Sequence, residues 1–371
     1  MVEKYQEIKQ TGKIKKEQIT LRNCNKHKRN YEEQLLSSHT FAPDSDSNSQ
    51  FMKKLFYFLL LLLLFINLAA KAQQDPQFSF NRLAQLSVNP GYAGSNNGIT
   101  GLILNRYQWS GFEGAPKTLL FSVEKATSIF GGKSGIGLNI ISDELGFEKN
   151  ILVNLNYSYH TITSLGDLGI GASFGIFNKA YNAAWDVPDD QDYSYSTHYT
   201  QPSNDDLIPD DGTSQFAFDS GLGVYLKSND YFVGFSVTHI NEAKIDFSDS
   251  YTFMVRHYYL SAGYNISLSN PLFELRPSIF AKSDLASTQV DLNVDLVYKE
   301  RFSGGLSYRH QDAIVVLLGV EMLNGLNIGL AYDITTSTLG RYGYGSQEIY
   351  LRYSLDLSKG RLKKYKSIRF L

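Results

Sequence analysis

The sequence predicts an all-β protein: a transmembrane antiparallel outer-membrane β-barrel of about fourteen strands, preceded by a signal peptide. Three observations carry this prediction. A secretory segment lies ahead of the strands, apolar and polar residues then alternate with a period of two, and the expected connections are alternately long and short. Alternation gives a sheet with one apolar and one polar face, and closing that sheet removes the unpaired edges that lipid does not tolerate.

Composition agrees with this class and excludes others. The 371 residues include 25 Tyr, 23 Phe and 30 Gly but only 9 Pro, and membrane barrels use aromatic girdles and tightly packed glycine-containing strands. Lys and Arg number 35 and Asp and Glu number 37, a net charge of -2, so no basic surface predicts nucleic-acid binding. The one cysteine, Cys24, lies outside the expected mature chain, which therefore offers no disulfide or thiolate metal site.

A secretory signal peptide is expected at residues 52–72. A charged start at Met52 is followed by an apolar run and then by Ala70 and Ala72, a cleavage site that leaves Gln73 as the new N-terminus. The apolar run, 55–68, has 14 residues, fewer than the roughly 20 that a membrane-spanning helix needs. Residues 1–51 are expected to be a non-native or disordered leader, with translation starting at Met52; the alternative is a genuine cytoplasmic leader ahead of a signal anchor.

The mature chain divides into three expected parts. Residues 73–98 form an N-terminal segment that plugs the lumen, covers the periplasmic mouth or simply leads into the first strand. Residues 99–357 form the barrel, and residues 358–371 form a basic periplasmic tail. The tail either engages an anionic partner or is a solvated run of charges. An even number of strands places both ends of the mature chain in the periplasm.

The alternation is clearest at residues 290–296. Val290, Leu292, Val294 and Leu296 share one face, which is assigned to lipid. Asp291, Asn293 and Asp295 share the other face and, with Arg309, are the candidates for the lumen, either as a polar interior network or as the lining of a channel. Interface girdles are expected from outward tyrosines; the candidates are Tyr157, Tyr159, Tyr259, Tyr264, Tyr298 and Tyr308.

Connection lengths separate a membrane barrel from a soluble β-sandwich. The candidate strands are 99–109, 117–126, 134–142, 149–161, 166–182, 215–227, 231–242, 256–268, 273–282, 289–298, 302–309, 313–322, 326–333 and 347–357. Long connections such as 183–214, 243–255 and 334–346 then lie on one side, and short ones such as 162–165, 228–230 and 299–301 lie on the other. Long outside and short inside is typical of outer-membrane barrels.

No catalytic, cofactor-binding or metal site is predicted, and the protein is expected not to be an enzyme. The aspartate-rich segment 186–211 lacks the spacing of a calcium loop and is interpreted as a solvated surface loop. The seven histidines show no metal-ligand spacing, and His160 and His310 are expected at strand ends. Residues 131–134, Gly-Gly-Lys-Ser, lack the earlier glycine and following helix of a phosphate loop, so a periplasmic turn is expected. The serine and histidine pairing of a barrel hydrolase is not recognisable.

A series of short motifs follows the signal peptide. The first are Asp75-Pro76-Gln77-Phe78-Ser79, Asn89-Pro90-Gly91-Tyr92-Ala93-Gly94 and Arg106-Tyr107-Gln108-Trp109 with Gly111-Phe112-Glu113-Gly114-Ala115-Pro116-Lys117-Thr118. Residues 156–160, 289–293, 331–333 and 346–349 continue the series. In number and order, from Gln73 onward, the motifs resemble those of the PorP/SprF family of type IX secretion system membrane proteins of Bacteroidetes. Gln347, where the family more often has His, and Gly91, where Ala is usual, are mild departures.

The resemblance implies an outer-membrane role in type IX protein secretion. Such barrels act with specific secreted substrates and help to export them or hold them at the cell surface, including adhesins used for gliding motility. The implied partners are other secretion components, a secreted cargo protein, outer-membrane lipid and a cell-wall or periplasmic lipoprotein contact through the tail. A passive porin, with Asp291, Asp295 and Arg309 lining a water-filled lumen, is the alternative. Residues 106–118 are expected to form a rigid outside loop that binds a partner or closes the barrel.

Overall fold

The computed structural model describes residues 75–96, 98–129, 131–182, 212–247, 250–322, 325–341 and 343–356. The expected leader, signal peptide, aspartate-rich segment 186–211 and basic tail lie outside these residues. No helix in the described ranges is long and apolar enough to cross a membrane.

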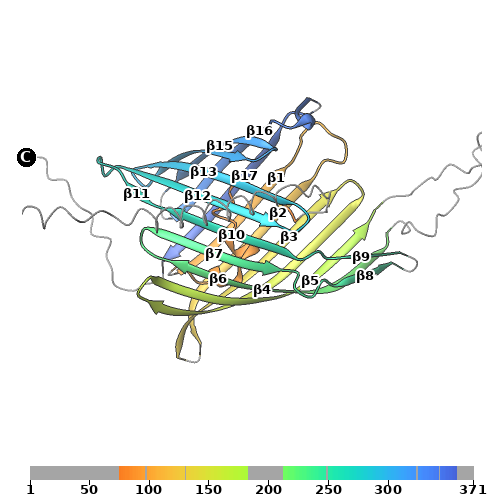
Figure 1. The fold of residues 1–371 in the computed structure, drawn as a ribbon, viewed down its shortest axis with the longest axis horizontal. Coiled ribbons are helices and arrows are strands. Elements are labelled where there is room, and N and C mark those ends of the chain that lie inside the picture. Colours follow the sequence, from red (N-terminus) through yellow and green to blue (C-terminus); the bar gives the residue numbers. More distant parts are fainter. Residues whose placement is uncertain are drawn as a thin grey trace, which may run out of the picture. The chain divides into compact units, whose positions relative to one another are not determined.

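Within the described ranges, fourteen antiparallel strands form a closed barrel (Figure 1). The strands are β1 (Gly98–Tyr107), β2 (Lys117–Ile129), β3 (Gly132–Leu145), β4 (Glu148–Thr163), β5 (Gly166–Tyr181), β6 (Ser214–Lys227), β7 (Tyr231–Thr238), β10 (His257–Tyr264), β12 (Phe273–Ser283), β13 (Thr288–Tyr298), β14 (Phe302–Arg309), β15 (Ala313–Glu321), β16 (Leu326–Thr335) and β17 (Ser346–Asp356). Consecutive members pair, and β1 pairs with β17 to close the ring. The predicted fold class and strand number are confirmed.

Alternate side chains along each strand face lipid and lumen, as the sequence predicts. On β13, Leu292 is 51% exposed, whereas Asp291 is 1% exposed. On β4, Leu155 and Tyr159 are likewise exposed, and His160 is buried on the lumen side. An exposed apolar surface of this kind is stable because lipid covers it, while the polar side chains are hydrogen-bonded inside.

The girdle assignment is wrong for one tyrosine. Tyr157, Tyr159, Tyr264 and Tyr308 point outward and are 39–50% exposed, and Tyr298 is half-buried. Tyr259 is only 4% exposed and lies on the lumen side. Its neighbour Leu260 faces outward, so the alternation along β10 turns Tyr259 inward.

The connections at one barrel end are mostly longer than those at the other. Residues 182–213, 239–256 and 336–345 join strands at the first end, where Gly146 and Phe147 also form a tight hairpin. Residues 164–165, 228–230 and 299–301 join strands at the second end. The expected loop 243–255 contains a hairpin that the sequence did not predict, β8 (Lys244–Phe247) with β9 (Ser250–Phe253), which extends past β6 and β7 in Figure 1. The expected turn at 131–134 is shorter, because β3 begins at Gly132.

The core of the protein lies inside the barrel. Residues 75–96, hereafter the lumen segment, contain α3 (Gln85–Val88) and the 3-10 turn η2 (Pro90–Tyr92) and pack against the inward side chains of the strands. Phe78 packs in a buried cluster with Leu104 and Leu120, and Phe80 packs against Tyr350 at 4.5 Å between ring centroids. Burial of these apolar side chains favours docking of the segment in the barrel.

Candidate functional site: the lumen segment and its binding wall

Five charged side chains on five strands form the ionic cluster at the centre of the lumen wall. They are Arg106 on β1, Asp291 on β13, Arg309 on β14, Asp333 on β16 and Glu348 on β17. Each is 1–2% exposed. The Arg106 guanidinium lies 2.7 Å from Asp333 and 3.1 Å from Glu348, and Arg309 lies 2.8 Å from Asp333 and 3.3 Å from Asp291. Charges this deeply buried are tolerated only when they are paired and hydrogen-bonded.

Ser79 of the lumen segment completes this cluster. Its hydroxyl accepts a hydrogen bond from Arg106 Nη1 at 2.8 Å and donates one to Asp333 Oδ1 at 2.7 Å. The backbone N–H groups of Ser79 and Phe80 donate to the two oxygens of Glu348, each at 2.8 Å. The cluster holds three carboxylates and two guanidiniums, so these backbone donors compensate the excess negative charge.

Asp291 binds the lumen segment on the other side of Ser79. Gln77 Nε2 donates to both Asp291 oxygens at 3.2 and 3.1 Å, and Asn81 Nδ2 donates to one of them at 3.3 Å. Asn293 reaches Asn81 at 3.4 Å. The structure thus brings three of the four lumen candidates onto the lumen segment: Asp291 and Arg309 contact the Asp75-Pro-Gln-Phe-Ser motif, and Asn293 contacts Asn81 just after it.

Asp295, the fourth lumen candidate, lies apart from the ionic cluster. It lines a separate polar cavity of about 530 Å³ on the second-end side of the lumen segment, together with Arg82 and Arg276. Arg82 Nη2 donates to Asn265 at 2.6 Å. Residues 79–83 of the lumen segment line this cavity directly.

The second motif, Asn89 to Gly94, docks by close backbone approach. A Cβ atom added to Gly94 would lie 2.5 Å from the Cα of Gly135 on β3, and one added to Gly135 would lie 1.9 Å from the Ala93 carbonyl oxygen. A Cβ on Gly171 of β5 would lie 2.5 Å from the Pro90 carbonyl group. Gly94 also has a φ of 73°, a conformation that glycine adopts without strain. We call Gly135, Gly169, Gly171 and Gly223 the glycine wall; each would place a Cβ within 2.5 Å of residues 89–94.

Polar contacts fix this turn in register. Asn89 Nδ2 donates to the Val224 carbonyl at 3.1 Å, and Asn89 Oδ1 accepts from the Gly91 N–H at 2.9 Å. The buried Glu124 carboxylate accepts from the Gly94 N–H at 2.9 Å and from Asn96 at 2.6 Å. Tyr92 packs edge-on against Tyr225 with 5.0 Å between ring centroids.

Ser158, His160 and Asp167 come together at the second end in the order of a hydrolase triad. Ser158 Oγ lies 2.9 Å from His160 Nε2, and His160 Nδ1 lies 3.3 Å from Asp167 Oδ1. The Ala93 carbonyl covers this site, because it accepts from Ser158 Oγ at 2.5 Å and lies 2.7 Å from His160 Nε2. Ser158 is fully buried. Ser158 and His160 therefore anchor the Ala93 carbonyl of the lumen segment, and Asp167 lies behind His160.

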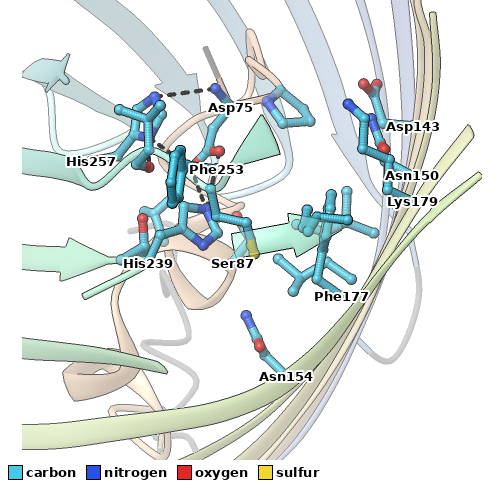
Figure 2. Close-up of a pocket in the computed structure, with 18 of the residues that line it drawn as sticks. Asp75, Ser87, Asp143, Asn150, Asn154, Phe177, Lys179, His239, Phe253 and His257 are labelled. Atoms are coloured by element: carbon cyan, nitrogen blue, oxygen red, sulfur yellow. Dashed lines mark hydrogen bonds and ion pairs between the residues drawn. The ribbon is translucent and has the colours of Figure 1, made fainter. Parts of the chain in front are cut away.

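Asp75, the first described residue, binds at the first end of the barrel. Its carboxylate lies 3.1 Å from His239 Nε2 and accepts a hydrogen bond from the Tyr259 hydroxyl at 2.6 Å. Burial alone would raise the pKa of the Asp75 carboxyl, but His239 and His257 outweigh burial and hold that pKa below its usual range. The carboxyl group is therefore ionised at neutral pH. Figure 2 shows Asp75 between the two histidines beside a cavity of about 140 Å³.

The Arg106 to Thr118 block does not act as one unit. Arg106 belongs to the ionic cluster, whereas residues 108–116 form a loop at the first end. The Ser110 N–H donates to the Gly345 carbonyl, and the Tyr344 N–H donates to the Ser110 carbonyl, both at 2.7 Å. Trp109 has a φ of 49° and Gly111 one of 104°, so Gln108, Trp109, Gly111, Phe112, Gly114 and Pro116 shape a loop tied to the β16–β17 connection.

The family assignment follows from comparison with known sequences. The profile of the family described as "Type IX secretion system membrane protein PorP/SprF" matches residues 70–353. The chain belongs to this family. It is an outer-membrane component of the type IX secretion system, and the motifs that first indicated the family are the ones that hold the lumen segment in place.

Known structures resemble the chain more distantly. The Ralstonia pickettii toluene transporter TbuX shares 11% identity with a TM-score of 0.43, covering 76% of this chain and 95% of its own. Acinetobacter baumannii Omp33 shares 8% with a TM-score of 0.40, covering 71% and 100%. The P. putida toluene transporter TodX shares 10% identity with a TM-score of 0.39, covering 72% of this chain and 90% of its own. Among curated proteins, none matches this sequence.

Sequence reasoning missed several residues of the site. Asp333 and Glu348 belong to the motifs 331–333 and 346–349, but the motifs alone predict no role for them, although their neighbours Tyr332 and Ile349 face lipid. His239 and His257 are 18 positions apart and belong to the ends of two neighbouring strands. The pairing of β7 with β10 brings them together, and no spacing rule along the chain reveals that.

Proposed function

We propose that this type IX secretion component acts with specific secreted substrates, such as gliding adhesins, and helps to export them or hold them at the cell surface. In this proposal it works as a plugged partner barrel and not as an open pore. The observation that carries the proposal is the docking of the lumen segment across the barrel, where the ionic cluster binds one end and the glycine wall binds the other. A barrel filled in this way presents its loops, and not its lumen, to partners.

We further propose that the first end of the barrel faces outward and that β17 leads the C-terminal tail into the periplasm. The prediction of a periplasmic N-terminus does not fit this orientation, because Asp75, two positions after Gln73, binds at the first end. The unequal connection lengths at the two ends support this orientation. Residues 183–214 and 239–256 then face the exported substrate, and the tail 358–371 contacts periplasmic partners such as a lipoprotein or the cell wall. Addition of protease to intact cells tests the orientation: cleavage within 183–214 is expected, and cleavage only after the outer membrane is opened would contradict it.

Deletion of the gene tests the export role. A proteome of the medium and of the cell surface is expected to lose one or a few secreted substrates, and re-expression of the wild-type chain is expected to restore them. Unchanged secretion and surface retention of every substrate would count against the role. Re-expression of the variant Arg106→Met then tests whether secretion of these substrates requires the docked lumen segment.

A passive porin is the second candidate. The polar cavity of about 530 Å³ lined by Arg82, Arg276 and Asp295 favours it, since this space would belong to a conducting path if the lumen segment left. Planar-bilayer recordings separate the two functions. Purified wild-type protein is expected to be closed and a chain lacking residues 75–96 is expected to conduct, whereas a stable open wild-type pore would favour the porin.

The proposed role is not enzymatic. Ser158, His160 and Asp167 have the order of a triad, but the Ala93 carbonyl lies on both the serine and the histidine. Purified protein is expected to hydrolyse neither phospholipid nor ester substrates. Hydrolysis by the wild type that disappears in Ser158→Ala would overturn this part of the proposal.

A further inference from the structure

Asp75, His239 and His257 form a histidine cluster that the family role does not explain. Their donor atoms all lie within 4.8 Å of one another. The cluster joins the start of the lumen segment to the ends of β7 and β10, and both histidines are at most 5% exposed. It is the one group of three or more such side chains with this geometry among the described residues.

His239 points Nε2 at the Asp75 carboxylate, whereas both ring nitrogens of His257 face Asp75: Nδ1 lies 3.7 Å from Oδ2, and Nε2 lies 3.3 Å from the backbone nitrogen. His239 Nδ1 lies 2.8 Å from the buried Asp219 carboxylate, and His257 Nδ1 lies 2.8 Å from the Val255 carbonyl oxygen. His239 lies between two carboxylates, Asp219 at Nδ1 and Asp75 at Nε2, so the Nε2 proton has to leave before that nitrogen binds a metal. A proton on His257 Nδ1, donated to the Val255 carbonyl, leaves a lone pair on His257 Nε2. His239 Nε2 is 3.1 Å from Asp75 Oδ1, and His257 Nε2 accepts a hydrogen bond from the Asp75 N–H at 3.3 Å. A carboxylate or carbonyl behind a histidine is the usual outer partner of a metal-binding histidine.

The donor atoms, which lie within 4.8 Å of one another, have to draw closer to bind a small divalent ion. Zinc bonds to nitrogen and oxygen are about 2.0–2.2 Å, so donors in a tetrahedral zinc site lie about 3.3 Å apart. The Asp75 and His239 donors are already at that separation. Metal binding would replace the long Asp75 N–H to His257 hydrogen bond with a metal–nitrogen bond.

The fourth position is open to the cavity beside the cluster. This cavity of about 140 Å³ is lined by the three ligands and by apolar residues including Phe177, Phe253 and Met254 (Figure 2). Its volume accommodates water, whose share of the liquid is about 30 Å³ per molecule. Two imidazoles, one carboxylate and one open position are a donor set that zinc accepts readily.

We propose that Asp75, His239 and His257 bind a zinc ion that ties the start of the lumen segment to the barrel wall. Asp219 is a positioning residue that orients His239. The site goes beyond the secretion role and does not depend on it, since the fold alone assembles it. A bound zinc ion would hold the first end of the lumen segment by metal coordination, in addition to the ionic cluster and the glycine wall.

Zinc binding by the full-length protein in detergent tests the proposal. Protein stripped with EDTA is loaded with zinc, freed of excess metal and analysed for metal content, and its affinity is measured by competition with a chromophoric zinc chelator. One zinc per chain is expected for the wild type. His257→Gln and Asp75→Asn are each expected to weaken affinity at least tenfold, and Asp219→Asn by roughly 10- to 100-fold, the usual effect of removing an outer partner.

The matched control is His310→Gln, which removes an exposed histidine from the turn between β14 and β15. It is expected to keep wild-type affinity. Cobalt substitution provides an independent readout: absorption bands of a four-coordinate site are expected for the wild type and not for His257→Gln. Retention of the heat-sensitive electrophoretic mobility of a folded barrel shows that each variant is intact. The proposal would be overturned if the wild type bound no stoichiometric zinc, or if His257→Gln and Asp75→Asn bound zinc as tightly as the wild type. The cluster would then be a purely ionic contact between histidine and aspartate.

Discussion

The two ends of the lumen segment are held by opposite physical means. Around Ser79, long charged side chains reach inward from five strands and supply specific hydrogen bonds. Around Gly94, glycines let backbone meet backbone at Gly135 and Gly171, and Glu124, Ser158 and His160 add hydrogen bonds beside them. Docking around Ser79 therefore depends on charged side chains of the wall, and docking around Gly94 depends on glycines that leave room for the backbone.

This difference predicts different sensitivities. Removal of a partner from a buried ionic cluster leaves an uncompensated charge. A glycine has no side chain to remove, so the glycine wall is disrupted only when atoms are added to it. The ionic end is therefore sensitive to truncation, and the glycine end is sensitive to enlargement.

Loss of Arg106 is expected to have the largest effect. Arg106→Met leaves Glu348 and Asp333 with one guanidinium between them and removes a donor to Ser79. Breaking a buried charge cluster in this way typically costs about 3–5 kcal/mol. Guanidinium unfolding of the purified barrel is expected to show a loss of that size, and planar-bilayer recordings are expected to show openings as the lumen segment leaves its site.

The same substitution at an exposed arginine is the control. Arg301→Met changes the turn between β13 and β14, where the side chain is exposed, and is expected to shift the unfolding free energy by no more than about 0.5 kcal/mol. Equal stability of Arg106→Met and Arg301→Met would show that the ionic cluster does not hold the segment.

Enlargement of the glycine wall is expected to have the next largest effect. In Gly135→Val the new Cβ would lie 1.9 Å from the Ala93 carbonyl oxygen, so residues 89–94 must move away from β3. Overpacking of this kind typically costs about 1–3 kcal/mol. Limited proteolysis is expected to cleave the lumen segment faster than in the wild type, because the displaced turn becomes accessible.

Gly101→Ala is the matched control on β1. The nearest heavy atom to its added Cβ is 4.0 Å away, so the lumen segment is expected to keep wild-type resistance to protease. If Gly135→Val were as resistant as Gly101→Ala, close backbone approach would not be what positions this turn.

The barrel was predictable from the sequence because lipid on one side and the lumen on the other require apolar and polar residues to alternate along each strand. Leu292 and Asp291 alternate in the sequence and face opposite sides in the structure. Tyr259 shows the limit of this reasoning: Tyr258 and Tyr259 are adjacent, and composition alone does not decide which one faces lipid. The β8–β9 hairpin was missed because its two strands have four residues each, too few for a clear alternation.

The site was predictable only in part, since its members meet through barrel closure. Alternation in the sequence predicts an inward face for Asp291 and Arg309. The structure adds that Gln77, 214 positions from Asp291, donates to Asp291, and that Ser79, 230 positions from Arg309, accepts from Arg309. Likewise, Gly135 and Gly171 look like ordinary strand glycines until the lumen segment is placed on them. Contacts of this separation depend on the register of several strands at once, which local periodicity does not encode.

Removal of the Ser79 hydroxyl is expected to have a moderate effect. Ser79→Ala leaves the backbone N–H donors to Glu348 in place but deprives Asp333 and Arg106 of a shared partner. Leaving buried polar groups unsatisfied typically costs about 1–3 kcal/mol, less than the expected loss for Arg106→Met. The unfolding free energies of the two variants, measured side by side, check this order; a larger loss in Ser79→Ala would place the main contribution in the hydroxyl and not in the charges.

The smallest effect is expected for an ion pair outside the lumen. Lys149 Nζ lies 3.0 Å from Glu144 Oε1, a distance similar to those in the ionic cluster, but the two side chains are 40% and 48% exposed. Exposed pairs of this kind contribute about 0–1 kcal/mol because solvent screens them. Lys149→Gln is therefore expected to unfold within about 1 kcal/mol of the wild type and to leave the lumen segment closed in bilayer recordings. If Lys149→Gln lost as much unfolding free energy as Arg106→Met, the contribution of a charged pair to stability would depend on its distance and not on its burial against the lumen segment.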